Sequence, residues 1–284
     1  MSPQPGSVQR LAELQTRVNN RATFSEQTAE AKKLWKSKRN SKVGRTAFDD
    51  IKTVLESMAV SVIVCNYCEQ AQANDIEHIA PKGFFPNLAF VWENYILSCK
   101  QCNTGYKSDK CFVLNETATP IEMKRGQMPR FQEMAFINIR TEDPNAFRML
   151  NMRTFKFHIF DNLSPRDRVK ANITLEILEL NRRDTLIKAR REAARYYYSR
   201  AEKIVAIQRA ASVPEIKRIL TPYDLPIEPN ADLLRVKNDL LAGFKRDIRT
   251  HQHPSVWYAI KKVESKVDQK GIRLFDALSE MRGW

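Results

Sequence analysis

The feature that most constrains this chain is a pair of Cys-x-x-Cys motifs, one formed by Cys65 and Cys68 and the other by Cys99 and Cys102. Two such hooks, brought together by folding, supply the four thiolates of a tetrahedral structural zinc site. A redox pair or four incidental thiols are the alternatives, and the doubled spacing favours zinc. We therefore expect a structural Zn²⁺ that replaces an apolar core in this short segment. Cys111 lies outside the pattern and is expected to be an ordinary buried thiol.

The cysteine usage and the apolar patterning also bear on location. Five cysteines, four of them in two close pairs, fit a reducing compartment better than a disulfide framework. Residues 1–9 contain no basic stretch followed by an apolar run, and no apolar stretch reaches the ~20 residues of a membrane span. These features predict a cytoplasmic protein that does not cross a membrane.

The charge balance favours a polyanionic partner. Lys and Arg number 47 against 33 Asp and Glu, which gives a formal net charge of +14 over 284 residues. Nucleic acid is the first candidate, because phosphate neutralisation by cations releases counterions. Lys36, Lys38 and Arg39 belong to a basic stretch without an intervening acid. Both a solvated connector and a phosphate-contacting patch remain open for that stretch.

The pattern of apolar residues divides the chain into three regions. Residues 1–60 are expected to form a basic helical region, because Phe48, Ile51 and Leu55 recur on one helix face. Residues 61–115 form a small module that opens with a predicted strand at 61–64. Residues 116–284 are expected to be mainly helical, with a strand-like stretch at 154–160, a helix start at Ser164 and helices near 183–211, 231–249 and 255–266. Pro222, Pro226 and Pro229 interrupt the chain between the first two of these helices. The expected fold class is α+β, a zinc-stabilised module within a mostly helical protein.

Between and just after the two cysteine pairs lie residue types suited to phosphodiester hydrolysis. His78 is preceded by Asp75-Ile76-Glu77, and two asparagines, Asn94 and Asn103, follow it. A neutral imidazole, with an ordinary pKa near ~6.5, can deprotonate water at physiological pH. Charge that develops on a phosphate calls for a hard divalent cation held by oxygen ligands. Adjacent strand residues point to opposite faces, so Glu77 and His78 serve one site only if the strand ends or twists there.

The order His78, Asn94, Asn103, interleaved with the cysteine pairs, resembles the ββα-metal motif of HNH endonucleases. The resemblance implies that His78 is the general base and that Asn94 orients the histidine loop. It also implies that Glu77 and Asn103 bind a catalytic Mg²⁺ or Mn²⁺, with Asp75 as a further candidate ligand. Glutamate stands where the commonest HNH pattern has aspartate, and its extra methylene changes the reach of Glu77.

A longer string narrows the resemblance. Residues 75–82, Phe85-Pro86, residues 90–94 and Leu97-Ser98-Cys99 resemble HNH nucleases encoded beside AAA- or ABC-type ATPases in bacterial antiviral systems. This resemblance covers about residues 61–115 and implies an ATPase partner, in keeping with the absence of a Gly-x-x-x-x-Gly-Lys-Ser/Thr motif from this sequence. The expected function is a metal-dependent endonuclease, with DNA preferred and RNA possible. The alternative is a non-catalytic zinc-knuckle protein that binds nucleic acid or docks an ATPase. Six cations are candidate nucleic-acid contacts: Lys36, Lys38, Arg39, Lys82, Lys107 and Lys110.

Overall fold

A computed structural model describes residues 1–59, 63–70, 72–221, 224, 227 and 231–284. The chain is of mixed α+β class and separates into two compact units. The first unit comprises residues 1–149 and 157–183, and the second comprises residues 150–156 and 184–284. Each unit is considered by itself.

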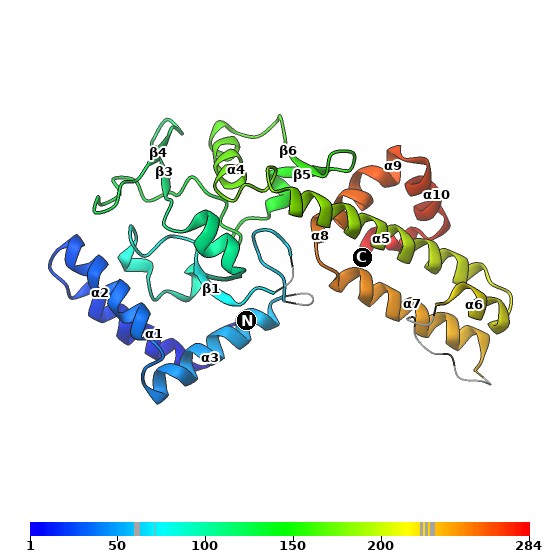
Figure 1. Ribbon diagram of the computed structural model, residues 1–284, viewed down its shortest axis with the longest axis horizontal. Coiled ribbons are helices and arrows are strands. Elements are labelled where there is room, and N and C mark those ends of the chain that lie inside the picture. The colour runs from blue at the N-terminus through cyan, green and yellow to red at the C-terminus, as the bar shows by residue number, and fades with distance from the viewer. Residues whose placement is uncertain (60–62, 71, 222–223, 225–226, 228–230) are drawn as a thin grey trace. The chain divides into compact units, whose positions relative to one another are not determined.

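Three helices begin the first unit: α1 (Pro5–Asn19), α2 (Phe24–Ser37) and α3 (Lys42–Ser57) (Figure 1). Thr23 and Glu26 form a capping box at the start of α2, and the Ser41 hydroxyl accepts a hydrogen bond from the Gly44 amide at the start of α3. Phe48 and Ile51 are fully buried, as the apolar stripe predicts. The apolar face of this region was therefore predicted from the sequence, whereas the caps at Thr23 and Ser41 were not.

The segment that carries both cysteine pairs contains two short strands and a helix. Strand β1 (Asp75–His78) pairs antiparallel with β2 (Tyr95–Ser98), and Glu77 lies opposite Ile96 in the register. The connection between them contains two 3₁₀ turns, η1 (Pro86–Leu88) and η2 (Trp92–Asn94). A π-helix, η3 (Gln101–Lys107), follows β2. Of the strand predicted at 61–64, residues 61 and 62 lie outside the described residues.

The remainder of the first unit contains the hairpin β3 (Phe112–Leu114) and β4 (Pro120–Glu122), the turn η4 (Pro144–Ala146) and helix α4 (Pro165–Ile177). Strands β5 (Arg148–Asn151) and β6 (Lys156–Ile159) pair with each other, and residues 150–156 of this pair belong to the second unit. Strand β6 falls within the predicted stretch 154–160. The Ser164 hydroxyl caps α4 by accepting a hydrogen bond from the Asp167 amide, as the Ser-Pro pair indicates.

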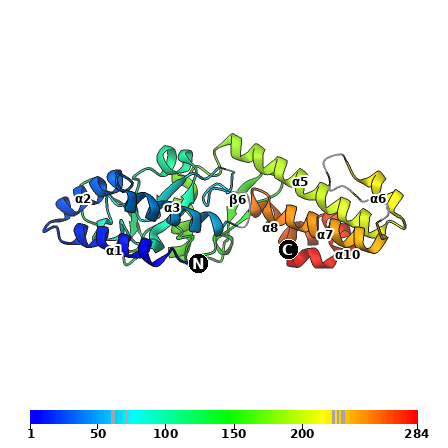
Figure 2. The same cartoon turned by 90° about the horizontal axis from the view of Figure 1, so that it is seen from below.

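The second unit is built from helices (Figures 1 and 2). Its long helix α5 (Asp184–Arg209) packs along α7 (Leu233–Thr250). The other helices are α6 (Val213–Ile219), α8 (Pro254–Ala259), η5 (Ile260–Glu264), α9 (Ser265–Val267), α10 (Gln269–Ala277) and η6 (Ser279–Gly283). The helices predicted near 183–211, 231–249 and 255–266 correspond to α5, α7 and the run from α8 to α9. Pro222, Pro226 and Pro229 lie outside the described residues. None of the helices that the structure describes is both long enough and apolar enough to span a membrane.

The compact units differ from the three regions expected from the sequence. The expected boundaries at 60/61 and 115/116 both fall inside the first unit, whereas the observed division falls after Arg183. Contacts across the expected boundaries explain the difference, because the Gln15 side chain in α1 bonds to the backbone at Pro86 and Phe90. The segment between the expected boundaries thus packs with the elements around it and belongs to the same compact unit.

Candidate functional site

The four paired cysteines converge on one point. The sulfur atoms of Cys65, Cys68, Cys99 and Cys102 all lie within 4.8 Å of one another. The Cys68 and Cys99 Sγ atoms are 3.8 Å apart, and tetrahedral zinc with Zn–S bonds of about 2.3 Å places its sulfur ligands about 3.8 Å apart. The donor set and its spacing therefore fit a structural zinc ion. Cys111 lies outside the cluster, and burial raises the pKa of its thiol to about 12.

Both cysteine pairs are attached to strand β2. The first pair is attached through Asn66, whose amide donates to the Leu97 carbonyl and whose side-chain Oδ1 accepts from the Leu97 amide, each at 3.1 Å. The second pair follows the strand directly, and the Cys102 amide donates to Cys99 Sγ at 3.4 Å. Sequence reasoning missed Asn66, although an asparagine inside a Cys-x-x-Cys turn is well suited to imitate a strand partner.

His78 ends strand β1 with its ring buried against aromatic side chains. The ring centroid lies 4.1 Å from that of Trp35 and 5.2 Å from that of Tyr95. His78 Nε2 is 2.9 Å from the Ala89 carbonyl oxygen, which can only accept, so Nε2 carries the proton and Nδ1 keeps its lone pair. Burial, reinforced by the positive charge of Lys82, holds the pKa of His78 well below its ordinary value. The imidazole is therefore neutral at physiological pH.

Asn94 joins the two backbone stretches that hold the histidine. Its Oδ1 accepts from the Ala80 amide at 2.7 Å, and its Nδ2 donates to the carbonyls of Ala80 at 3.0 Å and Leu88 at 2.9 Å. Ala80 follows His78 by two residues, and Leu88 precedes the hydrogen-bond acceptor of the histidine ring. A buried carboxamide that makes three such bonds fixes the loop rather than facing a ligand.

Two residues of the N-terminal helices also hold this loop, and sequence reasoning missed both. Gln15 in α1 donates from Nε2 to the Pro86 carbonyl at 3.1 Å and accepts from the Phe90 amide at 2.8 Å. Trp35 in α2 covers the histidine ring. The available signal was the position of Gln15 on the apolar face of α1, between Leu14 and Val18, because a polar residue on a buried face needs partners.

Three oxygen-bearing side chains lie at the start of β1 and in η3. Asp75 and Glu77 are two residues apart on a strand and therefore share a face. Asn103 Nδ2 donates to Asp75 Oδ2 at 3.1 Å. The side-chain Oδ1 of Asn103 could therefore be a ligand for a cation. Carboxylate and carboxamide oxygens are the ligands that Mg²⁺ and Mn²⁺ prefer. The structure brings Asp75 and Asn103 into contact, whereas Glu77 Oε1 is bonded to Lys107 and Glu77 lines a different cavity from Asp75.

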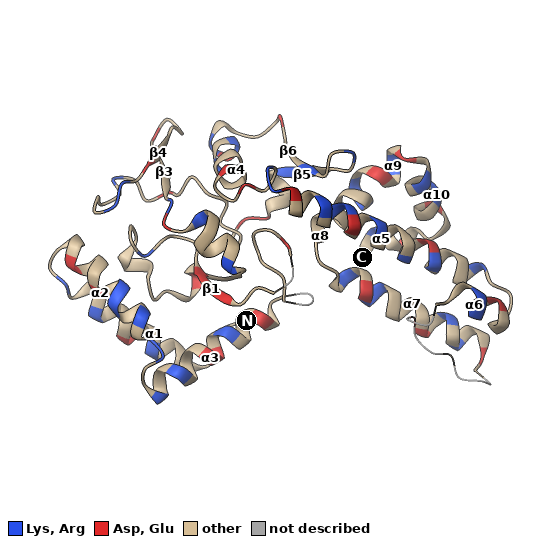
Figure 3. Ribbon diagram, viewed as in Figure 1, with Lys and Arg blue, Asp and Glu red and all other residues tan. Residues whose placement is uncertain are grey.

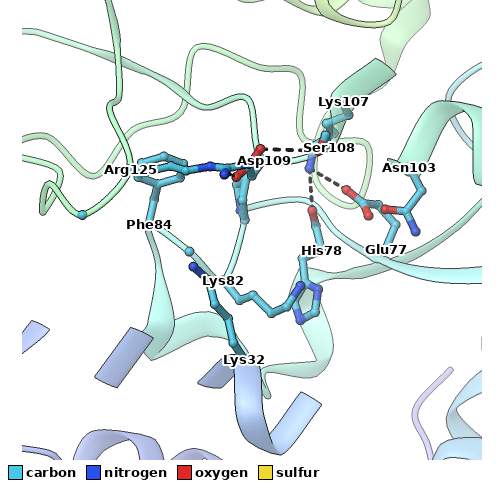
Figure 4. Close-up of a pocket in the computed structure, with 13 residues that line it drawn as sticks. Lys32, Glu77, His78, Lys82, Phe84, Asn103, Lys107, Ser108, Asp109 and Arg125 are labelled. Atoms are coloured by element: carbon cyan, nitrogen blue, oxygen red, sulfur yellow. Dashed lines mark hydrogen bonds and ion pairs between the residues drawn. The ribbon is translucent and has the colours of Figure 1, made fainter. Parts of the chain in front are cut away.

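Lys107 occupies a different environment from the one its sequence position indicated. Its Nζ lies 2.5 Å from Glu77 Oε1 and 2.7 Å from the His78 carbonyl oxygen, and the residue is 1% exposed (Figure 4). We expected Lys107 either to contact phosphate or to be solvated, whereas the structure buries it as the counter-ion of Glu77. The physical reason is the burial of Glu77, because a carboxylate removed from water requires a charged, hydrogen-bonded partner.

One small cavity brings several of these groups together. Glu77, His78, Asn103 and Lys107 line a cavity of about 100 Å³ together with Lys82 (Figure 4). Two further cations at its wall, Lys32 and Arg125, were not anticipated from the sequence. Both Glu77 and His78 line this cavity, and strand β1 ends at His78.

The remaining predicted cations divide into three kinds. Lys38 and Lys82 lie over Trp35, with Nζ atoms 4.1 and 5.7 Å from a ring centroid of this residue. Burial, together with the positive charges of Lys82 and Arg39, lowers the pKa of Lys38 to about 8. Arg39 forms an ion pair with Asp49 at 2.6 Å. Lys36 and Lys110 are exposed to solvent. Figure 3 shows Lys and Arg distributed over the helices of both units.

Comparison with known proteins gives one short similarity. The chain is 41% identical over 44 residues to the Septu protein PtuB of Bacillus thuringiensis, a match that covers 14% of this chain and 17% of that protein. The chain thus aligns with less than a fifth of the length of this relative. No protein-family model matches the chain, and no solved structure matches it. The local similarity indicates a Septu-related protein with a four-cysteine cluster that could bind a metal.

Proposed function

We propose that this protein is a divalent-metal-dependent endonuclease of the HNH type that hydrolyses phosphodiester bonds of nucleic acid. The observation that supports the proposal most is the cavity shared by Glu77, His78 and Asn103. A neutral imidazole and two side chains with oxygen ligands line this cavity. They come from strand β1 and helix η3, and the four-cysteine cluster lies in the same segment. A protein that only bound nucleic acid would need neither the base nor the oxygen donors.

In this mechanism His78 is the general base. Its Nδ1 accepts the proton of the attacking water, while the Ala89 carbonyl stabilises the imidazolium that forms by accepting from Nε2. Asn94 keeps that carbonyl and the histidine backbone in place. Asn103 and Glu77, with Asp75, would hold the Mg²⁺ or Mn²⁺, which supplies charge stabilisation for the scissile phosphate and the leaving oxygen.

The charges around the cavity support nucleic acid as the substrate. Lys82 and Lys32 line the cavity, and Lys38 shares the ring of Trp35 with Lys82. These cations would contact phosphates on either side of the scissile bond, with Lys36 and Lys110 as more distant contacts. DNA is the preferred substrate, and RNA is possible.

The biological setting follows from similarity rather than from the geometry. The matched relative is named as a Septu protein, and the motif around His78 resembles nucleases encoded beside ATPases in antiviral systems. We infer that the chain is the effector of such a system in the bacterial cytoplasm. Its partner would be an AAA- or ABC-type ATPase, which supplies the nucleotide-dependent control that this chain's own motifs do not provide.

The deciding experiment is a cleavage assay on the purified chain, alone and co-expressed with an ATPase if one is encoded beside it. Plasmid DNA and RNA are incubated with and without Mg²⁺ or Mn²⁺. His78→Ala should reduce the rate by about 10² to 10⁴, the usual contribution of a general base. His158→Ala is the matched control, because the His158 side chain is 65% exposed and does not line the cavity. Full activity of His78→Ala in the complex would refute the mechanism, and binding without cleavage in every arm would favour the non-catalytic alternative.

A further inference from the structure

A buried arginine contacts the four-cysteine cluster from outside. Arg183, the last residue of the first unit, is 5% exposed. Its Nη1 lies 3.2 Å from Cys102 Sγ, and its Nη2 donates to Gln101 Oε1 at 2.8 Å. One guanidinium therefore bonds at the same time to a candidate zinc ligand and to the residue beside it.

The same guanidinium also lies on an aromatic ring. Its central carbon is 4.5 Å from the ring centroid of Tyr106, so Arg183 contacts three residues of η3. This helix carries Cys102 near its start, and Asn103 and Lys107 of the candidate site follow within it. A group that fixes η3 thus fixes both the metal ligand and the residues that face the cavity.

Charge explains why a guanidinium is suited to this position. Four thiolates around one Zn²⁺ carry a net charge of −2, which is unfavourable where sulfur atoms are buried. A cation that donates a hydrogen bond to a ligand sulfur reduces that penalty without displacing the ligand. The planar fork of arginine can bond to the sulfur and to Gln101 together, which a lysine ammonium on a flexible stem does less well.

We propose that Arg183 is the positioning residue of the zinc centre: it neutralises the Cys102 thiolate and clamps η3 against the metal. Zinc retention and the placement of Asn103 then depend on a residue 81 positions along the chain from Cys102. The proposal concerns the four-cysteine centre and does not depend on the nuclease activity.

The test compares zinc release from full-length wild type and four variants, followed with a colorimetric chelator. Arg183→Gln removes the charge and should weaken zinc binding by about 10- to 100-fold, the usual effect of losing an outer partner of a metal ligand. Arg183→Lys should recover part of the loss. Arg182→Gln is the matched control, since the neighbouring Arg182 is exposed and its removal changes net charge equally. Gln101→Ala removes the hydrogen bond from Arg183 to Gln101 and should weaken zinc binding less than Arg183→Gln does.

A second measurement separates clamping from general destabilisation. Hydrogen exchange should accelerate in residues 99–110 of Arg183→Gln while α1 and α7 keep their protection. Equal zinc release from Arg183→Gln, Arg182→Gln and wild type would overturn the proposal, as would a wild-type chain that binds no zinc. If Arg183→Gln does not fold, Gln101→Ala and Arg183→Lys decide the matter, and wild-type zinc release from both would overturn it.

Discussion

The segment from Cys65 to Lys110 and the helical unit from Asp184 onward are held together in different ways. The first has two four-residue strands and a single turn-rich connection. Beside an apolar cluster around Phe84 and Phe85 it has several buried polar contacts, namely the thiol cluster, the Lys107–Glu77 pair and the carboxamide of Asn94. The second rests on apolar helix faces and on ring contacts of Trp257 with Tyr197 and Phe275.

The two regions should therefore differ in how well they tolerate amino-acid substitutions. A polar contact in a buried place is directional, and removing one partner leaves the other unsatisfied. An apolar helix face accepts other side chains of similar volume at modest cost. The cysteine-containing segment should therefore be sensitive to single atoms, and the helical unit to total apolar volume. Four experiments test this contrast, in order of decreasing expected effect.

The largest effect should come from removing the metal. Chelation of zinc, or Cys102→Ser, should unfold residues 65–110, because metal binding and folding are coupled and structural zinc contributes about 10 kcal/mol or more in small zinc modules. Hydrogen exchange should show lost protection in β1 and β2, with protection in α5 and α7 unchanged. Equal loss of protection in α5 would remove the contrast between the two regions.

The second effect concerns the buried ion pair. Lys107→Met keeps the length of the side chain but leaves the Glu77 carboxylate buried without a partner, which should cost about 3 to 5 kcal/mol of unfolding free energy in urea. The double variant Glu77→Gln with Lys107→Met should recover part of that loss. In the helical unit the buried Leu240→Met should cost less than about 1.5 kcal/mol. Similar costs for Lys107→Met and Leu240→Met would contradict the distinction.

The third effect is acid sensitivity of the helical unit. His253 is fully buried, and burial together with Arg190 lowers its pKa from 6.5 to about 3. Because the folded form holds the neutral imidazole, stability is complete above pH 6.5 and falls as the pH drops toward 3, by about 1.4 kcal/mol per pH unit. Burial also lowers the pKa of His251, which adds a loss of the same sign.

The measurement is hydrogen exchange of α5 and α7 between pH 6.5 and 4.5, corrected for intrinsic exchange rates. His253→Asn should flatten the pH dependence, and asparagine tolerates the positive φ of 60° at this position. An unchanged slope in His253→Asn would show that the acid sensitivity arises elsewhere.

The smallest effect concerns the link between α1 and the histidine loop. Gln15→Ala leaves the Phe90 amide and the Pro86 carbonyl without their partner and should cost about 1 to 2 kcal/mol. Gln9→Ala on the exposed face of the same helix is the control. Thermal unfolding compares the two, and a Gln9→Ala loss as large as that of Gln15→Ala would assign the effect to helix propensity.

Much of the fold and part of the site could be predicted from the sequence. Local helix signals predicted the fold, and residue spacing predicted part of the site. Helix periodicity and caps are local, so α3, α4, α5 and α7 could be read directly. The convergence of the four cysteines was predicted from their spacing alone and is confirmed by their sulfur distances. The roles of His78, Asn94 and Asn103 stay predictions, now with geometry that supports them.

The rest depends on contacts between distant residues, which no local pattern reports. Lys107 looked like a surface cation because its sequence neighbours are polar, yet the burial of Glu77 draws it inward. Gln15, Trp35 and Arg183 lie outside the expected module altogether. The division into compact units after Arg183 depends in the same way on contacts between distant residues, and the three regions expected from the sequence stay a prediction.

The contact between Arg183 and Cys102 has a consequence for how the protein is made. A ribosome that adds about 5 to 20 residues per second needs roughly 4 to 16 seconds to synthesise the 81 residues that separate the two positions. The nascent chain therefore presents all four thiols before their arginine exists. Metal capture by the growing chain therefore precedes completion of the clamp, and zinc bound during translation should dissociate faster than zinc bound by the finished chain.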